Sequence, residues 1–361
     1  TITGMVNPMI SSGLLRETTA QADETKAAGR PRMMLEFVAE AYYICGVDTG
    51  PYRTNYILTD LLGNIIAVRR TNQPLGEYQV TLERFAREIP DFLDETGIPR
   101  EKILGVGICL PGMIDGNADK IYDIFQEGWT EHSISTELGE RLGLKVEVEN
   151  NVRARAISAE LFDRMVKAEP FAYFFVSFGI ACQMIIDGKV LYGQSAAAGE
   201  IGHTVVQRNG PVCPTCGNRG CLEALTGERA ILQQCRDIMA TDTPTVLKEL
   251  CRDSNRLTMD QVLEAQKLGD KAVSQVIEDA IEYLGIALAN TINLISPRSV
   301  VLEGRILSTP TNQERMLRIV DQYMFHIHSG MTDFTFLPYD PDRGARAAAS
   351  VVVKEFLGRP L

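Results

Sequence analysis

The sequence predicts an α/β protein made of two similar halves, preceded by a short segment of different character. Three observations favour this fold class. The chain has 361 residues, 45% of them hydrophobic, so it can form more than one sizeable core. Strand-like and helix-like patterns alternate from about residue 42 onward. Residues 42–71 and 171–193 are both predicted as strands joined by tight turns, so each half opens on a hairpin-rich sheet.

In the first half, the turn Gly63-Asn64 divides the opening strands into a meander. An amphipathic helix is predicted over 81–97, and a buried strand with a turn over 103–115. The pattern then predicts a strand over 145–152 and a helix over 153–165.

In the second half, the longest helical pattern spans 270–296 and is ended by Pro297. A buried strand over 299–304 follows, and a helix rich in small residues over 344–357 closes the chain. The repeated opening pattern suggests a duplicated kinase-like fold of the actin type.

The first residues differ from this pattern. Apolar residues recur at helical spacing over 2–10, Gly13 is suited to end that helix, and a polar loop leads to an extended apolar segment. A helix followed by a basic loop and a strand is typical of the second half of a winged helix-turn-helix. Because such a module needs a preceding helix, we expect the sequence to begin inside a larger protein.

These patterns predict three regions. Residues 1–40 form a partial winged helix-turn-helix and a linker. Residues 41–149 with 341–361 form a smaller α/β domain. Residues 150–340 form a larger α/β domain, which we expect to hold a metal site and the dimer surface.

Composition narrows the class of protein. The sequence has neither a run of eighteen apolar residues nor an N-terminal secretion signal, so we expect no membrane span. Only three of the eight cysteines cluster, and the others stand singly in apolar surroundings, which favours reduced cysteines and a cytoplasmic location. The net charge of −11 should repel nucleic acid on average, so any contact with DNA must come from a local basic patch.

One histidine and three cysteines fall within nineteen positions: His203, Cys213, Cys216 and Cys221. This set is suited to one tetrahedral Zn²⁺. Four protein ligands leave no open position, so we expect one structural zinc per chain and no metal catalysis. The alternative is a group of reduced cysteines in a loop.

Several motifs together resemble those of the ROK family (repressors, open reading frames and kinases) over nearly the whole length. They are GVGICLPGMID, VEVENN, GEIGH, CGNRGCLE and LGIALANTINLISPRSVVLEG. The resemblance implies a two-domain actin-like (RNase H-like) ATPase fold and either a sugar kinase or a sugar-sensing transcription regulator. The family usually has one residue between its first two cysteines, whereas this chain has two, so we expect an altered loop at the zinc site.

The elements that bind ATP in kinases of the family have eroded here. Residues 48–52 stand where Asp-x-Gly-Gly-Thr is usual, and Pro51 has no amide to offer a phosphate. The second glycine-rich turn corresponds to 177–182, and the third to 303–304, where a glutamate replaces a glycine. The family's catalytic aspartate is Asn151, and losing a positioned base typically costs about 10²–10⁴-fold in rate.

The side that binds sugar is largely intact by the same resemblance. Carboxylates and amides suit paired hydroxyls, and Asn151 can still hydrogen-bond a hydroxyl that it cannot deprotonate. If His203 gives one ring nitrogen to zinc, the other can bind a sugar hydroxyl. The residues expected at the effector are Gly112, Asn150, Asn151, Glu200, His203 and Glu223. The alternative for the two glutamates is that they are solvated loop carboxylates.

At the N-terminus, Thr1, Thr3 and Asn7 would lie on the exposed face of a recognition helix, although Pro8 could kink it. Arg30 and Arg32 resemble the basic wing or linker of ROK regulators and suit a narrow minor groove. The alternative is a solvated basic loop. The net charge of residues 1–35 is only +1, four basic against three acidic side chains, so phosphate affinity must be local and modest.

The sequence thus predicts a sugar-responsive transcriptional regulator, a repressor that binds operator DNA and has no kinase activity. A sugar or sugar phosphate would bind between the two domains and change the spacing of two DNA-binding heads in a homodimer or a higher even oligomer. The alternatives are an ATP-dependent sugar kinase with a divergent site and a sugar-binding regulator that acts through a protein partner. The sequence leaves the sugar and the direction of its effect open.

Overall fold

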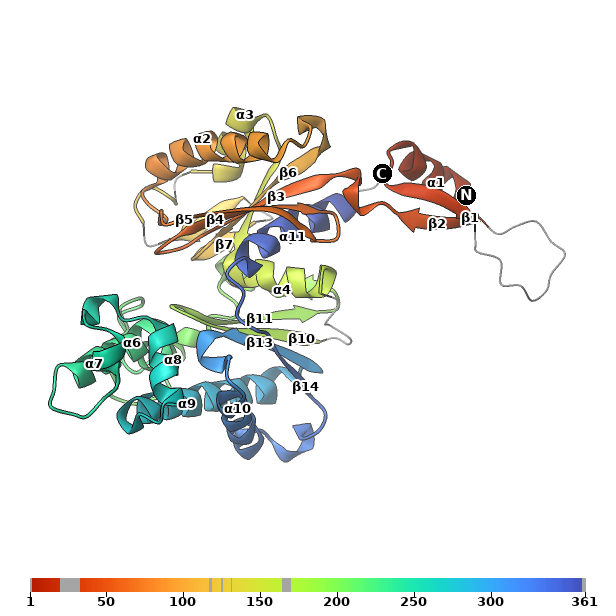
Figure 1. Ribbon diagram of the computed structural model, residues 1–361. Coiled ribbons are helices and arrows are strands. Elements are labelled where there is room, and N and C mark those ends of the chain that lie inside the picture. Colours follow the sequence, from red (N-terminus) through yellow and green to blue (C-terminus); the bar gives the residue numbers. More distant parts are fainter. Residues whose placement is uncertain are drawn as a thin grey trace. The chain divides into compact units, whose positions relative to one another are not determined.

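The computed structural model describes residues 2–19, 33–116, 119–124, 126–130, 132–163 and 170–358 (Figure 1). The chain forms two compact units, each described by itself below. Unit 1 comprises residues 1–164 and 342–361, and unit 2 comprises residues 165–341.

Unit 1 contains a five-stranded sheet that begins with the predicted meander. The strand order is β5 (Ile65–Thr71), β4 (Thr54–Asp60), β3 (Tyr43–Thr49), β6 (Ile103–Leu110) and β9 (Val146–Asn150). The pairs β3–β4 and β4–β5 are antiparallel, whereas β6 and β9 add to the sheet as parallel strands. A small hairpin of β7 (Met113–Asp115) and β8 (Lys120–Asp123) follows β6.

Unit 2 repeats the same strand order. Its sheet runs β12 (Lys189–Val190), β11 (Ile180–Ile186), β10 (Phe171–Val176), β13 (Ser299–Gly304) and β14 (Asp333–Phe336). Again the first three strands are antiparallel and the last two are parallel. The duplication predicted from the two hairpin-rich segments is therefore confirmed. The pattern missed β14, whose four residues are all at least partly exposed and carry no clear alternation.

Helices cover both faces of the sheet in unit 1 (Figure 1). Helix α2 (Tyr78–Thr96) packs with α3 (Ile134–Leu142) over the core that includes Cys45, Val47 and Val106. Helix α2 ends at Gly97, which is left-handed as a helix-ending glycine should be. On the other face lie α4 (Asn151–Leu161) and α11 (Arg343–Leu357).

The last helix approaches the sheet of unit 1 very closely. A Cβ atom at Gly46 would lie 2.0 Å from the carbonyl oxygen of Ala345, and one at Gly107 would lie 1.9 Å from that of Ala348. Only glycines on the strands and small residues on α11 allow this contact. Ala154 of α4 packs into the same small cluster as Ala348. Helix α4 therefore groups with unit 1, whereas the sequence pattern predicts that the second domain begins at residue 150.

The large core of unit 2 lies between its sheet and a set of helices. These are α5 (Leu222–Thr226), α6 (Glu228–Met239), α7 (Leu247–Leu250), α8 (Met259–Lys267), α9 (Lys271–Ile295) and α10 (Pro310–Tyr323). Helix α9 ends just before Pro297, as predicted, with Ser296 in a left-handed conformation. No helix in the described part of the chain combines the length and the apolarity needed to cross a membrane.

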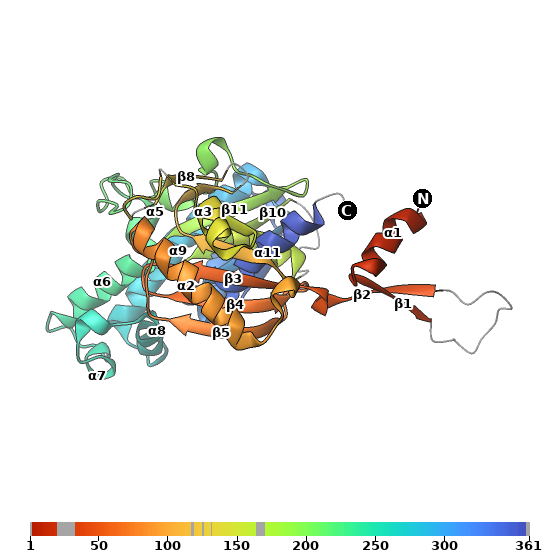
Figure 2. The ribbon, with the colours of Figure 1, turned by 90° about the horizontal axis from the view of Figure 1, so that it is seen from above.

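The N-terminal residues form the predicted helix and extended segment (Figure 2). Helix α1 (Ile2–Ser11) contains Pro8 and is followed by Gly13 at φ +78°. Strands β1 (Leu15–Thr19) and β2 (Met33–Phe37) then pair antiparallel, so the helix is followed by a two-stranded hairpin. Leu14 is buried in a cluster with Ile44 and Val352, so the start of this segment is attached to unit 1.

Candidate functional site

The four predicted metal ligands lie together in unit 2. His203 ends the short helix η4 (Ile201–His203), Cys213 and Cys216 lie in the loop that follows, and Cys221 directly precedes α5. One ligand atom from each residue lies within 4.8 Å of the other three. Both Cys213 and Cys221 are buried, whereas Cys216 is exposed.

The spacing of these atoms fits one tetrahedral ion. The Cys213 sulfur lies 3.8 Å from His203 Nδ1, and the sulfurs of Cys216 and Cys221 lie 3.5 Å apart. Sulfur ligands about 2.3 Å from a shared zinc, at tetrahedral angles, are about 3.8 Å from one another. Three sulfurs and an imidazole nitrogen form a donor set that suits zinc better than magnesium or calcium.

The loop between the cysteines is a tight turn despite its extra residue. The Cys213 amide donates to the Asn218 carbonyl at 2.7 Å, and the Gly217 amide donates to the Cys213 carbonyl at 2.9 Å. Gly217 has φ +75°, which favours glycine there. The loop thus bends back on itself and brings Cys216 toward Cys221.

The surroundings of Cys216 and Cys221 shift the pKa values of their thiols in opposite directions. The backbone of Asn218 is the chief cause that lowers the pKa of Cys216, whereas burial raises the pKa of Cys221 to about 12. A cysteine binds zinc as the thiolate. A metal ion bound by these sulfurs would stabilise their thiolate forms.

Two predicted effector residues flank the metal ligands. Glu200 immediately precedes η4, and its carbonyl accepts from the His203 amide at 3.1 Å. Glu223 lies in the first turn of α5 and is half-buried. Its Oε1 atom accepts a hydrogen bond from the hydroxyl of Thr215 at 2.5 Å. Thr215 is not among the predicted site residues, although the extra residue between Cys213 and Cys216 indicates that this loop differs.

The other predicted effector residues lie in unit 1, at the junction of β9 and α4. The Asn150 side chain accepts from the amides of Val152 at 2.9 Å and Arg153 at 3.1 Å, so it caps α4. Its Nδ2 donates to the Gly112 carbonyl at 2.8 Å. Only 8% of Asn150 is exposed, so most of its amide is engaged in the fold. Asn151 is the first residue of α4 and is half-buried.

A buried ion pair supports this junction. Glu149 Oε1 accepts from Arg153 Nε at 2.8 Å and from the Asn150 amide at 2.7 Å. Arg153 also donates to the Ile114 carbonyl and is 1% exposed. Gly112 has φ +115°, and a Cβ there would lie 2.3 Å from the Asp123 carbonyl oxygen, so glycine is required. Gly112 and Asn150 are therefore held rigidly together.

The predicted effector residues thus form two groups. The structure joins Gly112, Asn150 and Asn151 within unit 1. Glu200, His203 and Glu223 lie on and beside the metal loop of unit 2. Each unit positions its own group.

The three segments that the resemblance matches to phosphate-binding turns make hydrogen bonds within the fold. The Gly50 amide donates to the Arg53 carbonyl at 3.0 Å, and the Ser177 amide to the Gly179 carbonyl at 3.0 Å. Glu303 is buried and accepts from the hydroxyl of Tyr173 at 2.5 Å.

An arginine also lies beside the first of these turns. Arg155 Nη2 is 3.7 Å from Asp48 Oδ2, so the carboxylate of the last residue but one of β3 lies close to a positively charged side chain of the protein itself.

Only part of the predicted DNA contact set can be placed. Asn7 is exposed on α1. Thr3 lies in α1 without a described side chain, and Thr1, Arg30 and Arg32 lie outside the described residues. In the hairpin of β1 and β2, Arg16 makes two hydrogen bonds to Glu36, at 2.8 and 2.7 Å.

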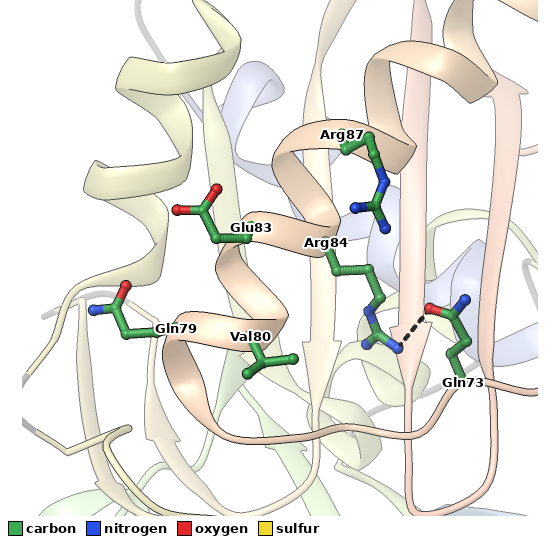
Figure 3. Close-up of a pocket in the computed structure, with 6 residues that line it drawn as sticks. All are labelled: Gln73, Gln79, Val80, Glu83, Arg84 and Arg87. Carbon is green, nitrogen blue, oxygen red and sulfur yellow. Dashed lines mark hydrogen bonds between the residues drawn. The ribbon is translucent and has the colours of Figure 1, made fainter.

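A shallow hollow lies elsewhere, beside α2 of unit 1 (Figure 3). It measures about 540 Å³ and is lined by Gln73, Gln79, Val80, Glu83, Arg84 and Arg87. Arg84 is buried, and it donates to Gln73 Oε1 at 3.4 Å and to the Pro74 carbonyl at 3.0 Å. None of the predicted site residues lines this hollow, and its arginine serves to fix the segment before α2.

Comparison with known proteins identifies similar chains. A model described as the ROK family matches residues 44–355. The xylose repressor of Bacillus subtilis (strain 168) is 26% identical over 360 residues, which cover 99% of this chain and 88% of that protein. The N-acetylglucosamine repressor of Escherichia coli O157:H7 is 25% identical over 315 residues, 84% of this chain and 73% of that protein.

Solved structures confirm the two-domain actin-like ATPase fold. A ROK family transcriptional regulator, described as a homologue of the E. coli MLC protein, superposes with a TM-score of 0.84 at 22% identity, over 99% of this chain and 88% of that one. A ROK family glucokinase from Streptomyces griseus superposes with a TM-score of 0.73 at 20% identity, over 86% of this chain and 98% of that one.

Proposed function

Because the chain belongs to the ROK family, we propose that it is a sugar-responsive transcriptional regulator, a repressor that binds operator DNA. One observation carries this proposal. The family match begins at residue 44, yet the similarity to a xylose repressor covers 99% of the chain and so includes α1, β1 and β2. The superposition with the glucokinase covers 98% of that protein but only 86% of this chain. The residues of this chain that have no counterpart in the glucokinase favour a regulator over a kinase.

We propose one structural Zn²⁺ per chain, held by His203 Nδ1 and the sulfurs of Cys213, Cys216 and Cys221. The mutual distances of the four ligand atoms support this ion. When bound, the zinc would fix the loop and the ring of His203 and would leave no coordination position for a substrate. His203 Nε2, at the other edge of the ring, then becomes the nitrogen that can bind a sugar hydroxyl.

The effector is a sugar or a sugar phosphate in this proposal. Glu200, His203 and Glu223 of unit 2, with Gly112, Asn150 and Asn151 of unit 1, would bind its hydroxyls. Since Asn150 already caps α4 and bonds Gly112, its contribution to the ligand is at most its remaining amide hydrogen. A ligand that contacts both groups would favour one arrangement of the two units over others.

We further propose that the chain transfers no phosphate. Asn151 lies at the position of the family's catalytic aspartate and cannot take a proton from a sugar hydroxyl. The amide of Gly50 is bound within its own hairpin, and Arg155 lies beside Asp48, where a kinase would bring a magnesium nucleotide.

DNA would be bound by α1 and the wing, with Thr1, Thr3 and Asn7 toward base edges and Arg30 and Arg32 toward a minor groove. A homodimer or a higher even oligomer would match a palindromic operator. The cytoplasmic location remains a prediction.

The proposal is tested in two steps. A thermal-shift screen of the full-length protein against sugars and sugar phosphates should find a ligand that stabilises it. Binding to operator fragments, measured with and without that ligand at a fixed salt concentration, should then change several-fold. Sequence-specific DNA binding that no sugar alters would contradict the proposal.

Two other functions make different predictions. A sugar kinase, which the similarity in fold to a glucokinase favours, would transfer phosphate from ATP to a hexose at an ordinary rate. A regulator that acts through a protein partner would bind a sugar without binding any operator.

A further inference from the structure

Thr215 lies between two of the metal ligands and contacts an effector residue. Its hydroxyl donates to Glu223 Oε1 at 2.5 Å, and both side chains are half-buried. A hydrogen bond to a carboxylate at this distance is short and charge-assisted. Two residues, Pro214 and Thr215, separate Cys213 from Cys216 in this loop.

The position of Thr215 is determined by the metal loop. Cys213 and Cys216 flank it, and the loop is closed by bonds from the Gly217 amide to the Cys213 carbonyl at 2.9 Å and from the Cys213 amide to the Asn218 carbonyl at 2.7 Å. Binding of a metal by both cysteines would fix the backbone on each side of Thr215.

The second carboxylate oxygen of Glu223, Oε2, also lies close to the protein. It lies 3.6 Å from the point where a Cβ of Gly179 would be, at the turn between β10 and β11. The carboxylate therefore lies between this turn and the metal loop. With Oε1 bonded to Thr215, the rotation of the carboxylate is restricted.

We propose that Thr215 is a positioning residue, through which the folded metal loop orients Glu223 toward the effector. A glutamate side chain that is ordered before binding loses less conformational entropy when a sugar hydroxyl donates to it. Effector affinity then depends on the metal loop through one hydroxyl, and by linkage the effector strengthens metal binding to the same degree. This inference rests on the proposed function, in which Glu223 binds a sugar hydroxyl.

The test compares Thr215→Val with Thr215→Ser in the full-length protein. Valine keeps the shape and removes the hydroxyl, whereas serine keeps the hydroxyl. We measure zinc per chain by metal analysis, and the Kd for the sugar that stabilises the wild-type protein most in the thermal-shift screen. We expect Thr215→Val to keep one zinc per chain and to weaken sugar binding about tenfold to a hundredfold, the range for a hydrogen bond to a charged group. Thr215→Ser should stay within about twofold of the wild-type Kd, because it restores the same bond.

Thr204→Val is the matched control. The Thr204 hydroxyl is next to the ligand His203 but donates to the Ile201 carbonyl at 2.7 Å. Removing it should leave the sugar affinity unchanged.

Three results overturn the inference alone. They are an unchanged sugar affinity in Thr215→Val, a loss of zinc in that variant, or an equal loss of affinity in Thr215→Ser. If the wild-type protein binds zinc but no sugar in the screen, the proposed function fails and this inference fails with it.

Discussion

At the level of single residues, Asn150 connects two backbone segments through one amide. Its oxygen caps α4, and its nitrogen bonds the carbonyl of Gly112 in the turn after β6. Both partners are backbone groups, and the asparagine is nearly buried. The residue that the resemblance assigns to the effector is therefore also a structural residue, and its replacement should affect folding before any ligand is added.

Replacing Asn150 by alanine should lower the free energy of unfolding of unit 1 by about 2 kcal/mol, because it removes a helix cap and leaves the Gly112 carbonyl without this donor. The single tryptophan, Trp129, is buried in unit 1, so its fluorescence in urea reports the transition. Asn151→Ala is the control, with an expected change below ~0.5 kcal/mol. Equal stability of Asn150→Ala and the wild type would contradict the capping role.

At the level of elements, the contact of α11 with its sheet depends on glycine. Gly107 of β6 lies directly against the backbone of α11, some 240 residues later in the chain. Rotating a side chain cannot relieve this contact, because the opposing atom is a carbonyl oxygen of the helix.

Gly107→Ala should therefore destabilise unit 1 by at least ~3 kcal/mol, since the helix must move away from the sheet. Gly50→Ala is the matched control, because a Cβ there meets nothing within 4 Å and should change stability by only ~0.5 kcal/mol. Trp129 fluorescence in urea measures both. Similar midpoints for the two variants would show that α11 does not approach the sheet as closely as described.

Helix α9 begins at a buried carboxylate. Asp270 accepts from the Val273 amide at 3.1 Å, the Val246 amide at 2.9 Å and the Thr245 hydroxyl at 2.6 Å. Burial by itself raises the pKa of Asp270. The hydrogen bonds to its carboxylate together lower the pKa by more than burial raises it, so the pKa in the folded protein is below the ordinary value.

Because the pKa of Asp270 is lower in the folded protein than in the unfolded chain, the stability of the fold falls at acidic pH. The ionised Asp270 stabilises the fold above the pKa of the unfolded chain, about 3.9, and this contribution is lost as the pH falls through the lower folded pKa. Asp270→Asn should be less stable than the wild type by about 1–2 kcal/mol at pH 7, and the difference should narrow below about pH 4. Urea unfolding followed by circular dichroism measures it.

Asp279→Asn, on the exposed face of the same helix, should differ from the wild type by less than ~0.5 kcal/mol at pH 7. A difference for Asp270→Asn that stays constant from pH 7 to pH 3 would argue against an ionised cap.

At the level of the whole molecule, each unit has its own hydrophobic core. Trp129 belongs to the core of unit 1, whereas the His203 and cysteine cluster lies in unit 2. A change at the metal ligands therefore acts first on unit 2.

Cys216→Ser should weaken zinc binding by about tenfold or more. The variant should respond less to sugar than the wild type, while its affinity for operator DNA stays largely unchanged. Its Trp129 transition should stay at the wild-type midpoint, because the proposed DNA-binding elements and the tryptophan belong to unit 1. Metal analysis, operator binding and fluorescence unfolding check the three parts. Equal loss of sugar response and DNA binding, with an earlier Trp129 transition, would indicate global unfolding instead.

Features that depend on spacing along the chain could be predicted from the residues alone. The strand meanders, the long helix ended by Pro297 and the metal ligand set within nineteen positions were all predicted, because their partners are near in sequence. Elements without strong periodicity, such as β14, were missed.

The folded structure was needed to show which distant residues are in contact. It assigned α4 to unit 1, placed Gly107 against Ala348, engaged Asn150 with Gly112 and brought the Thr215 hydroxyl to Glu223. Local patterns specify only which face of an element is apolar. The partner of that face is determined by packing the whole chain.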